Sequence, residues 1–455
     1  MKIALYIHRR DLRITDNYAL LAAQKSGLPV LPCFIFDPAQ VTNENEYRSK
    51  NALQFMLNSL QDLHTQLKDA GGRLYLFYGQ PHRIIAHLLK TLDVEALYIN
   101  TDYTPFSMQR DSGLKDLCDK HSISFNAYHD ALLNAPDSIK TGSGTPYGVF
   151  TPFYKRSAQE TVAAPLSLHT HHWYTKPISE AITLAAAHEK ILGSYNNTEL
   201  LLHGGRTEAI SILKKIADFE HYIKDRDICA LPTTHLSAHL KFGTISVREA
   251  YHTIAKKLGV HHPLLRQLYW RDFWTYVAYH NPHVFGHAYH AQYDNLPWNK
   301  SNKDFEQWCN GTTGFPIVDA GMRELNSTGF MHNRVRMIVA SFLTKDLHIS
   351  WQRGEQYFAQ QLLDYDPAVN NGNWQWAAST GCDGQPYFRI FNPWLQQKNF
   401  DPDCKYIKKW VPELAKYAPE DIHKHVKSPL PGYKKPMVDH AVESVRAKQM
   451  YKKAA

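Results

Sequence analysis

The chain has 455 residues, which is enough for two or three domains with hydrophobic cores of their own. Its formal net charge is +8 with 21% charged residues, a mild basic excess that is compatible with a polyanionic partner without requiring one. The six cysteines form no C-x-x-C pair, so they indicate reduced thiols of a cytoplasmic protein and support neither a disulfide framework nor an iron–sulfur cluster. No apolar run is long enough to cross a bilayer, and no signal peptide is expected.

Short apolar runs alternate with helix patterns through the first 130 residues. Strands are expected at 3–7, 30–36, 73–78, 96–100 and 124–128, with helices at 49–70, 81–92 and up to about 121. This alternation predicts an α/β domain over residues 1–130, with a doubly wound, mostly parallel sheet of Rossmann-like type. No glycine-rich dinucleotide or phosphate-loop motif follows the first strand. A ligand of such a sheet would lie at the carboxyl ends of its strands.

The remainder of the chain reads as a connector followed by helices. Residues 131–195 are loop-like, and a surface connector with short helices is expected. The cluster His169, His171 and His172 could bind a metal, but without a partnering pattern a solvated linker is favoured and no metal is expected. Helix patterns at 207–219, 246–258, 264–279, 317–325, 334–344 and 355–363 predict an all-α domain over residues 196–455. Its lysine-rich tail from residue 405 is expected to fray.

The segment 363–379 is unusually polar and aromatic. It contains two carboxylates, two adjacent amides and two indoles: Asp364, Asp366, Asn370, Asn371, Trp374 and Trp376. Such a stretch is a poor candidate for a core helix but suits a flat, redox-active ring, because carboxylates can accept from ring N–H groups and an amide can face a ring nitrogen. An indole can also pass on single electrons. The alternative is an aromatic-rich loop beneath a helical core.

Two further motifs have a functional and a structural interpretation. The hydroxyls of residues 233–237 stand before a helix and could donate to phosphate oxygens, or could simply cap that helix. Gln267, Trp270, Arg271 and Trp274 lie on neighbouring faces of one helix and could stack on and hydrogen-bond a base. A buried aromatic helix with a salt bridge is the alternative.

Five motifs stand out along the chain: His-Arg-Arg-Asp-Leu-Arg at 8–13, Thr-Gly-Phe-Pro-Ile-Val-Asp-Ala at 313–320, Met-His-Asn-Arg-Val-Arg-Met at 331–337, Ala-Ser-Phe-Leu at 340–343 and Asn-Asn-Gly-Asn-Trp-Gln-Trp at 370–376. Together they resemble the DNA photolyase/cryptochrome family, most closely its class I cyclobutane pyrimidine dimer photolyases. The resemblance implies an antenna domain, a connector and a helical domain that binds FAD. It implies an enzyme, a carbon–carbon lyase, in which excited reduced FAD gives an electron to a flipped-out pyrimidine dimer of damaged DNA.

Carried over by position, the resemblance implies three groups of functional residues. The FAD cradle would comprise Tyr222, Thr233, Thr234, His235, Leu236, Ser237, Arg336, Asp364, Tyr365, Asp366 and Asn370, which faces flavin N5. The photoreduction chain would run outward through Trp374, Trp351 and Trp298. The dimer would stack on Trp270 and Trp376, while DNA or the dimer pocket would be met by Arg226, Gln267, Arg271, Trp274, Asn333, Arg334, Arg389 and Gln396.

Two departures from the class I pattern bear on function. Gln267 replaces the usual glutamate, and we expect repair to survive because an amide still bonds a thymine edge. Asn333 and Met337 stand where enzymes that repair (6-4) lesions need a histidine pair, which argues against that substrate.

The second departure concerns the antenna. The pair Phe106 and Ser107 replaces the Asn-Glu pair of folate-binding members, so FMN, FAD or 8-hydroxydeazaflavin is expected rather than methenyltetrahydrofolate. This second chromophore would lie against Phe36, Asp102 and Phe106.

Two alternatives to repair remain open at this point. A cryptochrome-type blue-light photoreceptor would share the fold and the flavin, and Gln267 leaves room for it. A flavin oxidoreductase would need an NAD(P)H motif that the chain lacks. A monomer without membrane attachment is expected.

Overall fold

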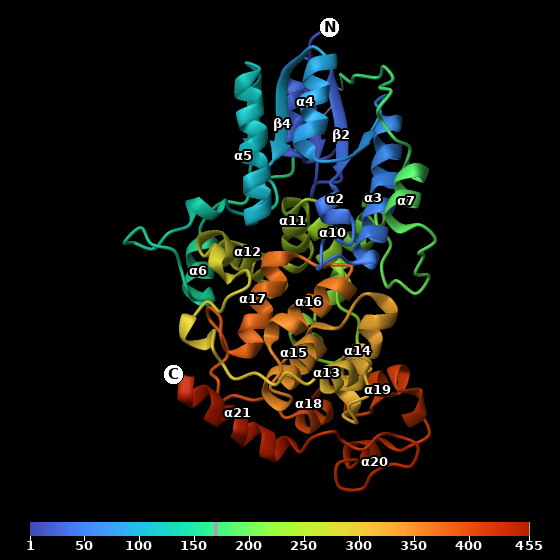
Figure 1. The fold of residues 1–455 in the computed structure, drawn as a ribbon, viewed down its shortest axis with the longest axis vertical. Coiled ribbons are helices and arrows are strands. Elements are labelled where there is room, and N and C mark those ends of the chain that lie inside the picture. The colour runs from blue at the N-terminus through green and yellow to red at the C-terminus, as the bar shows by residue number, and fades with distance from the viewer. Residues whose placement is uncertain (168–171, 455) are drawn as a thin grey trace.

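The computed structural model describes residues 1–167 and 172–454. An α/β part lies above a larger helical part, and the connector runs along both (Figure 1). His169 and His171 of the predicted linker lie outside the described residues, whereas the amide of His172 donates to Gln24.

Five parallel strands form one sheet in the order β3-β2-β1-β4-β5. They are β1 (Ile3–His8), β2 (Val30–Phe36), β3 (Tyr75–Tyr78), β4 (Val94–Asn100) and β5 (Ser124–Tyr128). Helices α1 (Tyr18–Lys25) and α3 (Lys50–Asp69) pack on one face of the sheet, and α4 (Pro81–Thr91) and α5 (Pro105–Lys120) pack on the other. The predicted doubly wound fold is therefore confirmed. Helix α1, which begins after the capping side chain of Asn17, was missed by the sequence patterns.

The connector is docked onto the sheet rather than loose. Single bridges join Trp173 to Val30 of β2 and Ile182 to Leu76 of β3. Its regular elements are η1 (Pro136–Ser138), α6 (Phe150–Ser157) and α7 (Leu184–Leu192). The loop before α6 projects from the molecule beside α12 (Figure 1). The boundaries 1–130, 131–195 and 196–455 stay predictions.

The rest of the chain is helical, with none of the named strands beyond β5 among the described residues. The elements are α8 (Arg206–Lys214), η2 (Ile216–Phe219), α9 (Tyr222–Asp225), α10 (Leu236–Phe242), α11 (Val247–Leu258), α12 (Leu265–His280), η3 (Pro282–Val284), η4 (Ala291–Tyr293), α13 (Asn302–Cys309), α14 (Pro316–Thr328), α15 (Asn333–Ser341), the π-helical turn η5 (Phe342–Asp346), α16 (Trp351–Gln361), α17 (Pro367–Ala378), α18 (Pro393–Phe400), α19 (Lys405–Trp410), η6 (Pro412–Leu414), α20 (Pro419–His423) and α21 (His440–Ala454). Within the described residues, none of the helices is long and apolar enough to cross a membrane.

The expectation of a frayed tail was wrong for the described residues. Tyr451 of α21 is fully buried, and its hydroxyl donates to the carbonyl of Ala378. Its ring lies 3.5 Å from Nζ of Lys345, a buried lysine whose pKa is lowered well below its usual value by burial. The tail is ordered because apolar residues such as Met450 share one face of α21, although the sequence around them is rich in lysine.

A network of buried charges joins the α/β part to the helices. Arg248 at the start of α11 binds Asp16 at 3.0 Å and Asp130 at 2.7 Å, and Asp130 also binds Arg13. All four side chains are at most 4% exposed. Two positive and two negative charges therefore neutralise each other at the interface, where an unpaired charge would be costly.

We expect Arg248→Met to destabilise the fold by about 3–5 kcal/mol, because it leaves Asp16 and Asp130 buried with one cation between them. The midpoint of denaturant unfolding measures the change. The matched control is Arg446→Met on α21, whose side chain is 69% exposed and which should shift stability by no more than about 0.5 kcal/mol. Equal midpoints for both variants would contradict the role given to the network.

Candidate functional site

The polar, aromatic segment forms helix α17, so the expectation that it makes a poor core helix was wrong. Asp366 caps the helix by accepting from the amides of Ala368 and Val369, and Pro367 occupies the first turn. Ser379 ends it in the left-handed conformation. The polar and aromatic side chains of this segment do not predict a helix, but the caps at both ends stabilise one.

Asp364 is the point where three predicted cradle segments meet. It accepts from Ser237 Oγ at 2.7 Å and from Arg336 at 3.0 and 3.3 Å. Arg336 also lies over the ring of Phe330, which His235 contacts edge-on. The predicted pairing of Arg336 with Asp364 therefore exists.

The segment before α10 does not cap that helix as an N-cap Ser or Thr would. The capping position is His235, in the left-handed conformation with φ 54° and without a side-chain cap bond. Thr233 and Thr234 precede it and are half-buried, whereas Ser237 lies within the helix. Leu236 is buried in the core and can offer a ligand only its backbone.

The amide of Asn370 is oriented by its neighbour. Its Nδ2 donates to the backbone carbonyl of Glu355 at 3.0 Å, which leaves Oδ1 as an acceptor without a partner in the part of the chain that the structure describes. The carboxyl of Glu355 accepts from Asn371 Nδ2 at 3.0 Å, and burial raises the pKa of Glu355 to about 7. The amide orientation suits a ring nitrogen that carries a proton.

The donors and acceptors that converge here fit a bound dinucleotide. Ser237 is exposed beside Asp364, and Nε2 of the buried His332 has no partner among the described residues. Burial also lowers the pKa of His332 to about 4, so this nitrogen is neutral at pH 7. A buried nitrogen of this kind needs a hydrogen-bond partner, which a water or a polar ligand can supply.

Two predicted cradle residues also contact other parts of the protein. Asp366 is 7% exposed and forms an ion pair with Arg10, so it links the helical part to the α/β part. Tyr365 is stacked against Tyr47, with ring centroids 6.4 Å apart. Tyr222 remains half-buried at α9, with Arg226 over its ring.

The three predicted photoreduction tryptophans belong to one hydrophobic cluster, with Trp298 packed against its outside. Trp374 and Trp351 are 2% and 1% exposed, whereas Trp298 is half-buried. Trp374 packs so closely on α16 that a Cβ at Gly354 would lie 2.2 Å from its ring. Trp351 is the first residue of α16. Two residues before it, Ile349 forms a bridge with Asn299, which directly follows Trp298. The electron-transfer role stays a prediction.

Trp308 was missed by sequence reasoning. It is fully buried, and its ring lies edge-on to Trp374 with centroids 6.2 Å apart. Its Nε1 donates to the carbonyl of Val339. None of the sequence motifs includes this residue, so only the packing of α13 against α15 and α17 brings it to the site.

The residues of helix α12 that were predicted to contact DNA differ in burial. Trp270 and Gln267 are half-buried. Trp274 is only 4% exposed because its ring packs on Gly372 of α17. Arg271 donates to the carbonyls of Ala131 and Leu240. The predicted DNA contact of Trp274 is therefore corrected, because its ring is buried. Arg271 also helps to hold α12 in place, and its contact with DNA stays a prediction.

The outer residues differ in their freedom to meet DNA. Arg389 and Asn333 are exposed, and the Asn333 amide contacts Met337 Sδ at 3.7 Å. Arg334 is tied to Asp227 at 2.8 Å. Two half-buried members complete this surface, namely Arg226, which also faces Asp227, and Gln396.

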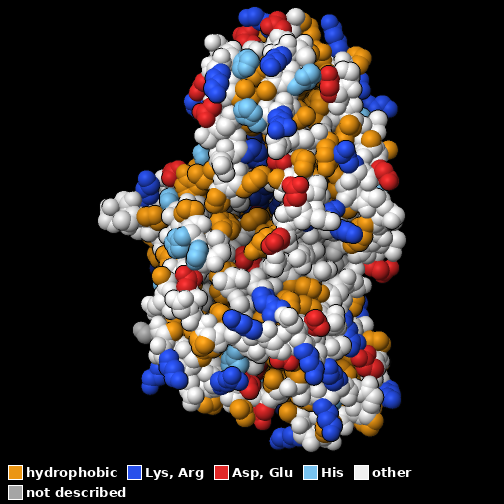
Figure 2. Space-filling view, viewed as in Figure 1, with side chains coloured by type: hydrophobic (Ala, Val, Ile, Leu, Met, Phe, Trp, Pro, Cys, Tyr) orange, Lys and Arg blue, Asp and Glu red, His pale blue; other side chains and the backbone are white. Residues whose placement is uncertain are grey.

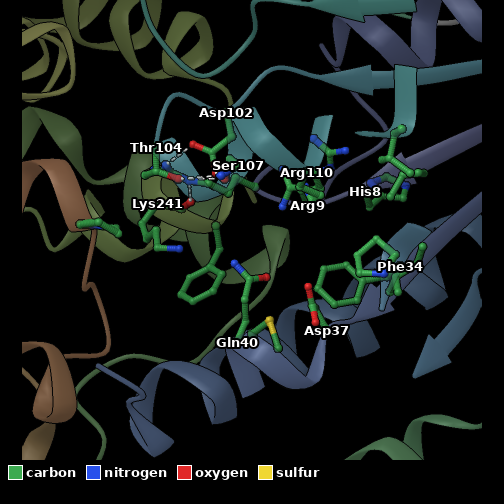
Figure 3. Close-up of a pocket in the computed structure, with 18 residues that line it drawn as sticks. His8, Arg9, Phe34, Asp37, Gln40, Asp102, Thr104, Ser107, Arg110 and Lys241 are labelled. Atoms are coloured by element: carbon green, nitrogen blue, oxygen red, sulfur yellow. Dashed lines mark hydrogen bonds and ion pairs between the residues drawn. The ribbon is translucent and has the colours of Figure 1, made fainter. Parts of the chain in front are cut away.

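A second pocket lies between the carboxyl ends of the strands and the helical part. It has an empty volume of about 850 Å³ that is partly open to solvent. Figure 2 shows a hollow with basic side chains on this face, and Figure 3 shows residues that line the pocket. Asp102 lines it, as predicted, and accepts from Arg10 at 3.0 Å and Ser107 Oγ at 3.0 Å.

Two predicted antenna residues are corrected. Phe36 is fully buried against α3, and its neighbour Phe34 on the same strand lines the pocket instead. Phe106 is 41% exposed and is not among the residues that line the pocket, whereas its neighbours Thr104 and Ser107 are. Arg110, which the sequence patterns missed, and Arg9 of the motif at 8–13 also line the pocket. Each has a buried guanidinium nitrogen without a partner among the described residues.

Comparison with known sequences identifies the family. Residues 4–169 match the DNA photolyase profile, and residues 264–453 match the FAD binding domain of DNA photolyase. A deoxyribodipyrimidine photo-lyase of Synechococcus sp. is 36% identical over 98% of this chain and 96% of its own length. The chain belongs to the DNA photolyase family.

Solved photolyase structures share the whole fold. An archaeal photolyase from Sulfolobus tokodaii, solved with two FAD molecules that imply a novel light-harvesting cofactor, has a TM-score of 0.90 at 42% identity, with both chains fully covered. A bacterial class III photolyase from Agrobacterium tumefaciens has a TM-score of 0.93 at 34% identity and covers 100% of this chain and 98% of its own. The predicted photolyase family and FAD cofactor are thereby confirmed. No cluster of three or more metal-ligating side chains occurs in the described part of the chain.

The raised pKa of Glu355 predicts a pH-dependent stability. Because the folded pKa, about 7, lies above the ordinary 4.5, the protonated carboxyl contributes stability that is lost as pH rises through 7. Glu355→Gln keeps an acceptor for Asn371 but does not ionise. As pH rises from 4 to 8, we expect the free energy of unfolding of Glu355→Gln to increase by up to about 3 kcal/mol relative to that of wild type. Denaturant unfolding at each pH measures it. A difference that is constant with pH would contradict this.

Proposed function

We propose that this protein repairs cyclobutane pyrimidine dimers in DNA in a light-driven reaction. The observation that carries the proposal is the arrangement around α17, which holds the oriented Asn370 amide, the buried Trp374 and the half-buried Trp376 on one helix. Trp270 of α12 packs on the same hydrophobic cluster as Trp376, so two indoles are available beside the flavin-facing helix. Flat aromatic rings at such a place suit an unstacked pyrimidine pair.

Each group of residues has a distinct part in this reaction. The FAD would be held by Ser237, Arg336 and Asp364. Asn370 Oδ1 would accept a hydrogen bond from a flavin ring N–H. When bound, FAD supplies the light absorption and the electron that splits the dimer. The half-buried Trp270 and Trp376 would hold the dimer out of the duplex, and Gln267 would bond a pyrimidine edge. Exposed Arg389 would bind phosphate, which makes affinity fall with salt.

The direct test is repair of a duplex that contains a thymine dimer, under blue light, with the bound FAD chemically reduced. Restoration of intact thymines is expected. A protein that binds FAD but leaves dimers unchanged in single- and double-stranded DNA would instead favour the blue-light photoreceptor. This second candidate is kept because position 267 carries an amide where the class I pattern has a carboxylate. The Gln267 amide donates to the Pro263 carbonyl at 3.3 Å.

Trp374→Phe should separate photoreduction from repair. Light-driven reduction of oxidised FAD should slow at least tenfold, because the residue nearest the predicted flavin site can no longer relay an electron. Repair by chemically reduced enzyme should stay within twofold. Trp308→Phe, which alters an adjacent buried indole outside the predicted chain, is the control. Parallel loss of photoreduction and repair in Trp374→Phe would contradict the assignment.

The pocket at the strand ends is proposed to hold a flavin-type antenna. Arg9, Arg110 and Lys241 make it basic, and burial lowers the pKa of Lys241 to about 8, which an anionic ligand would reverse. FMN should therefore bind more tightly than riboflavin, and methenyltetrahydrofolate should bind least. Titration of each ligand, followed by energy transfer to FAD, measures its affinity. Arg110→Gln should weaken FMN about tenfold and riboflavin little, and equal affinities for both ligands in wild type would contradict a phosphate contact.

A monomer in the cytoplasm is also proposed. All six cysteines are free and buried, which suits a reducing compartment. Sedimentation of the FAD-loaded protein tests the monomer.

A further inference from the structure

The indole of Trp270 is stacked on a residue of the connector. The ring of Phe150 lies 3.5 Å from it, centroid to centroid, at an interplanar angle of 8°. Phe150 begins α6 and is 1% exposed, whereas Trp270 is half-buried. Phe150 therefore covers one face of the indole and fixes the plane in which the rest of the ring is presented.

The backbone around Phe150 is held by the loop that follows α17. Its backbone N–H donates to Asp383 Oδ2 at 3.1 Å, and Cys382 Sγ contacts the Gly148 carbonyl at 2.7 Å. Residues 382 and 383 belong to the loop that follows Trp376 at the end of α17. The connector, α12 and the end of α17 therefore meet at this ring.

The outer face of Phe150 is also occupied. Tyr154, one turn later on α6, is stacked with it at 5.8 Å and 17°. The guanidinium of Arg266 lies 5.2 Å from both rings. Phe150 thus has Tyr154 and Arg266 as neighbours besides Trp270, and these contacts restrict its own movement.

We infer that Phe150 is a positioning residue for lesion recognition, which holds the Trp270 indole in the plane that receives the flipped-out dimer. This inference rests on the proposed repair function. Two parallel rings in contact keep each other from tilting. A smaller or non-planar side chain at 150 would therefore let the indole tilt and lose part of its stacking with the dimer. A branched or flexible side chain can fill the volume but cannot fix the plane.

A residue that merely fills the core would act differently, and the chain offers a matched control. Phe153 lies on the same helix, is 2% exposed and contacts Phe273 and Tyr276. It makes no ring contact with Trp270 within the described residues. Phe150→Leu and Phe153→Leu should therefore cost similar stability, while only the first should change recognition of the lesion.

The experiment uses FAD-loaded enzyme and two duplexes, one with a single thymine dimer and one undamaged. For Phe150→Leu we expect roughly three- to tenfold weaker binding of the damaged duplex and unchanged binding of the undamaged one. KM for repair should rise by the same factor while kcat at saturation is unchanged. FAD content and photoreduction should match wild type. Phe153→Leu should leave the ratio of the two affinities unchanged.

Trp270→Ala separates failure of the inference from failure of the proposed function. Should Trp270→Ala keep its preference for the dimer, the proposed lesion site is misplaced. Should Trp270→Ala lose that preference while Phe150→Leu keeps it, the positioning role of Phe150 is overturned. Equal weakening of both duplexes by Phe150→Leu overturns it as well. Phe150→Met, which fills the volume without a flat face, replaces Phe150→Leu should the latter fail to bind FAD, with the same expected outcomes.

Discussion

The buried charges of Arg13, Asp16, Asp130 and Arg248 are the constraint on which the arrangement of the two halves depends. Charges of this kind are costly to bury and are tolerated only while each keeps its partner. A sliding or rotation of the α/β part against the helices would separate them without water to replace the lost bonds. The two parts of the chain therefore have one favoured relative arrangement. That arrangement also fixes the shape of any pocket that both parts line.

Arg10 shows how this position reaches the chemistry. Its guanidinium binds Asp102, which lines the second pocket, and Asp366, which caps the helix that carries Asn370 and Trp374. The bond to Asp366 requires the two halves to be docked as they are, whereas Asp102 belongs to the same α/β part as Arg10. The wall of one chromophore pocket and the first turn of the flavin-facing helix thus share one side chain, although the two sites belong to separate parts of the chain.

The sequence predicted what local patterns determine. Strands at 30–36 and 124–128 coincide with β2 and β5, since alternating and buried apolar runs have few other structures available. The motif residues Ser237, Arg336 and Asp364 meet as the family resemblance implied. Predictions failed where long-range packing decides, because a motif marks a residue without showing which way it faces. Trp274 is covered by Gly372 and Phe36 by α3, and neither neighbour is close in sequence.

The same reason explains why the connector was undervalued. Its glycines and prolines indicate a loop, and nothing local distinguishes a solvated loop from one fixed at both ends by hydrogen bonds. Asp383 holds the backbone of Phe150 from a loop more than half the chain away, and Phe150 in turn covers Trp270. The plane of an indole on α12 therefore depends on a connector residue and on the end of α17, so the lesion site is a property of three segments that only the folded chain brings together.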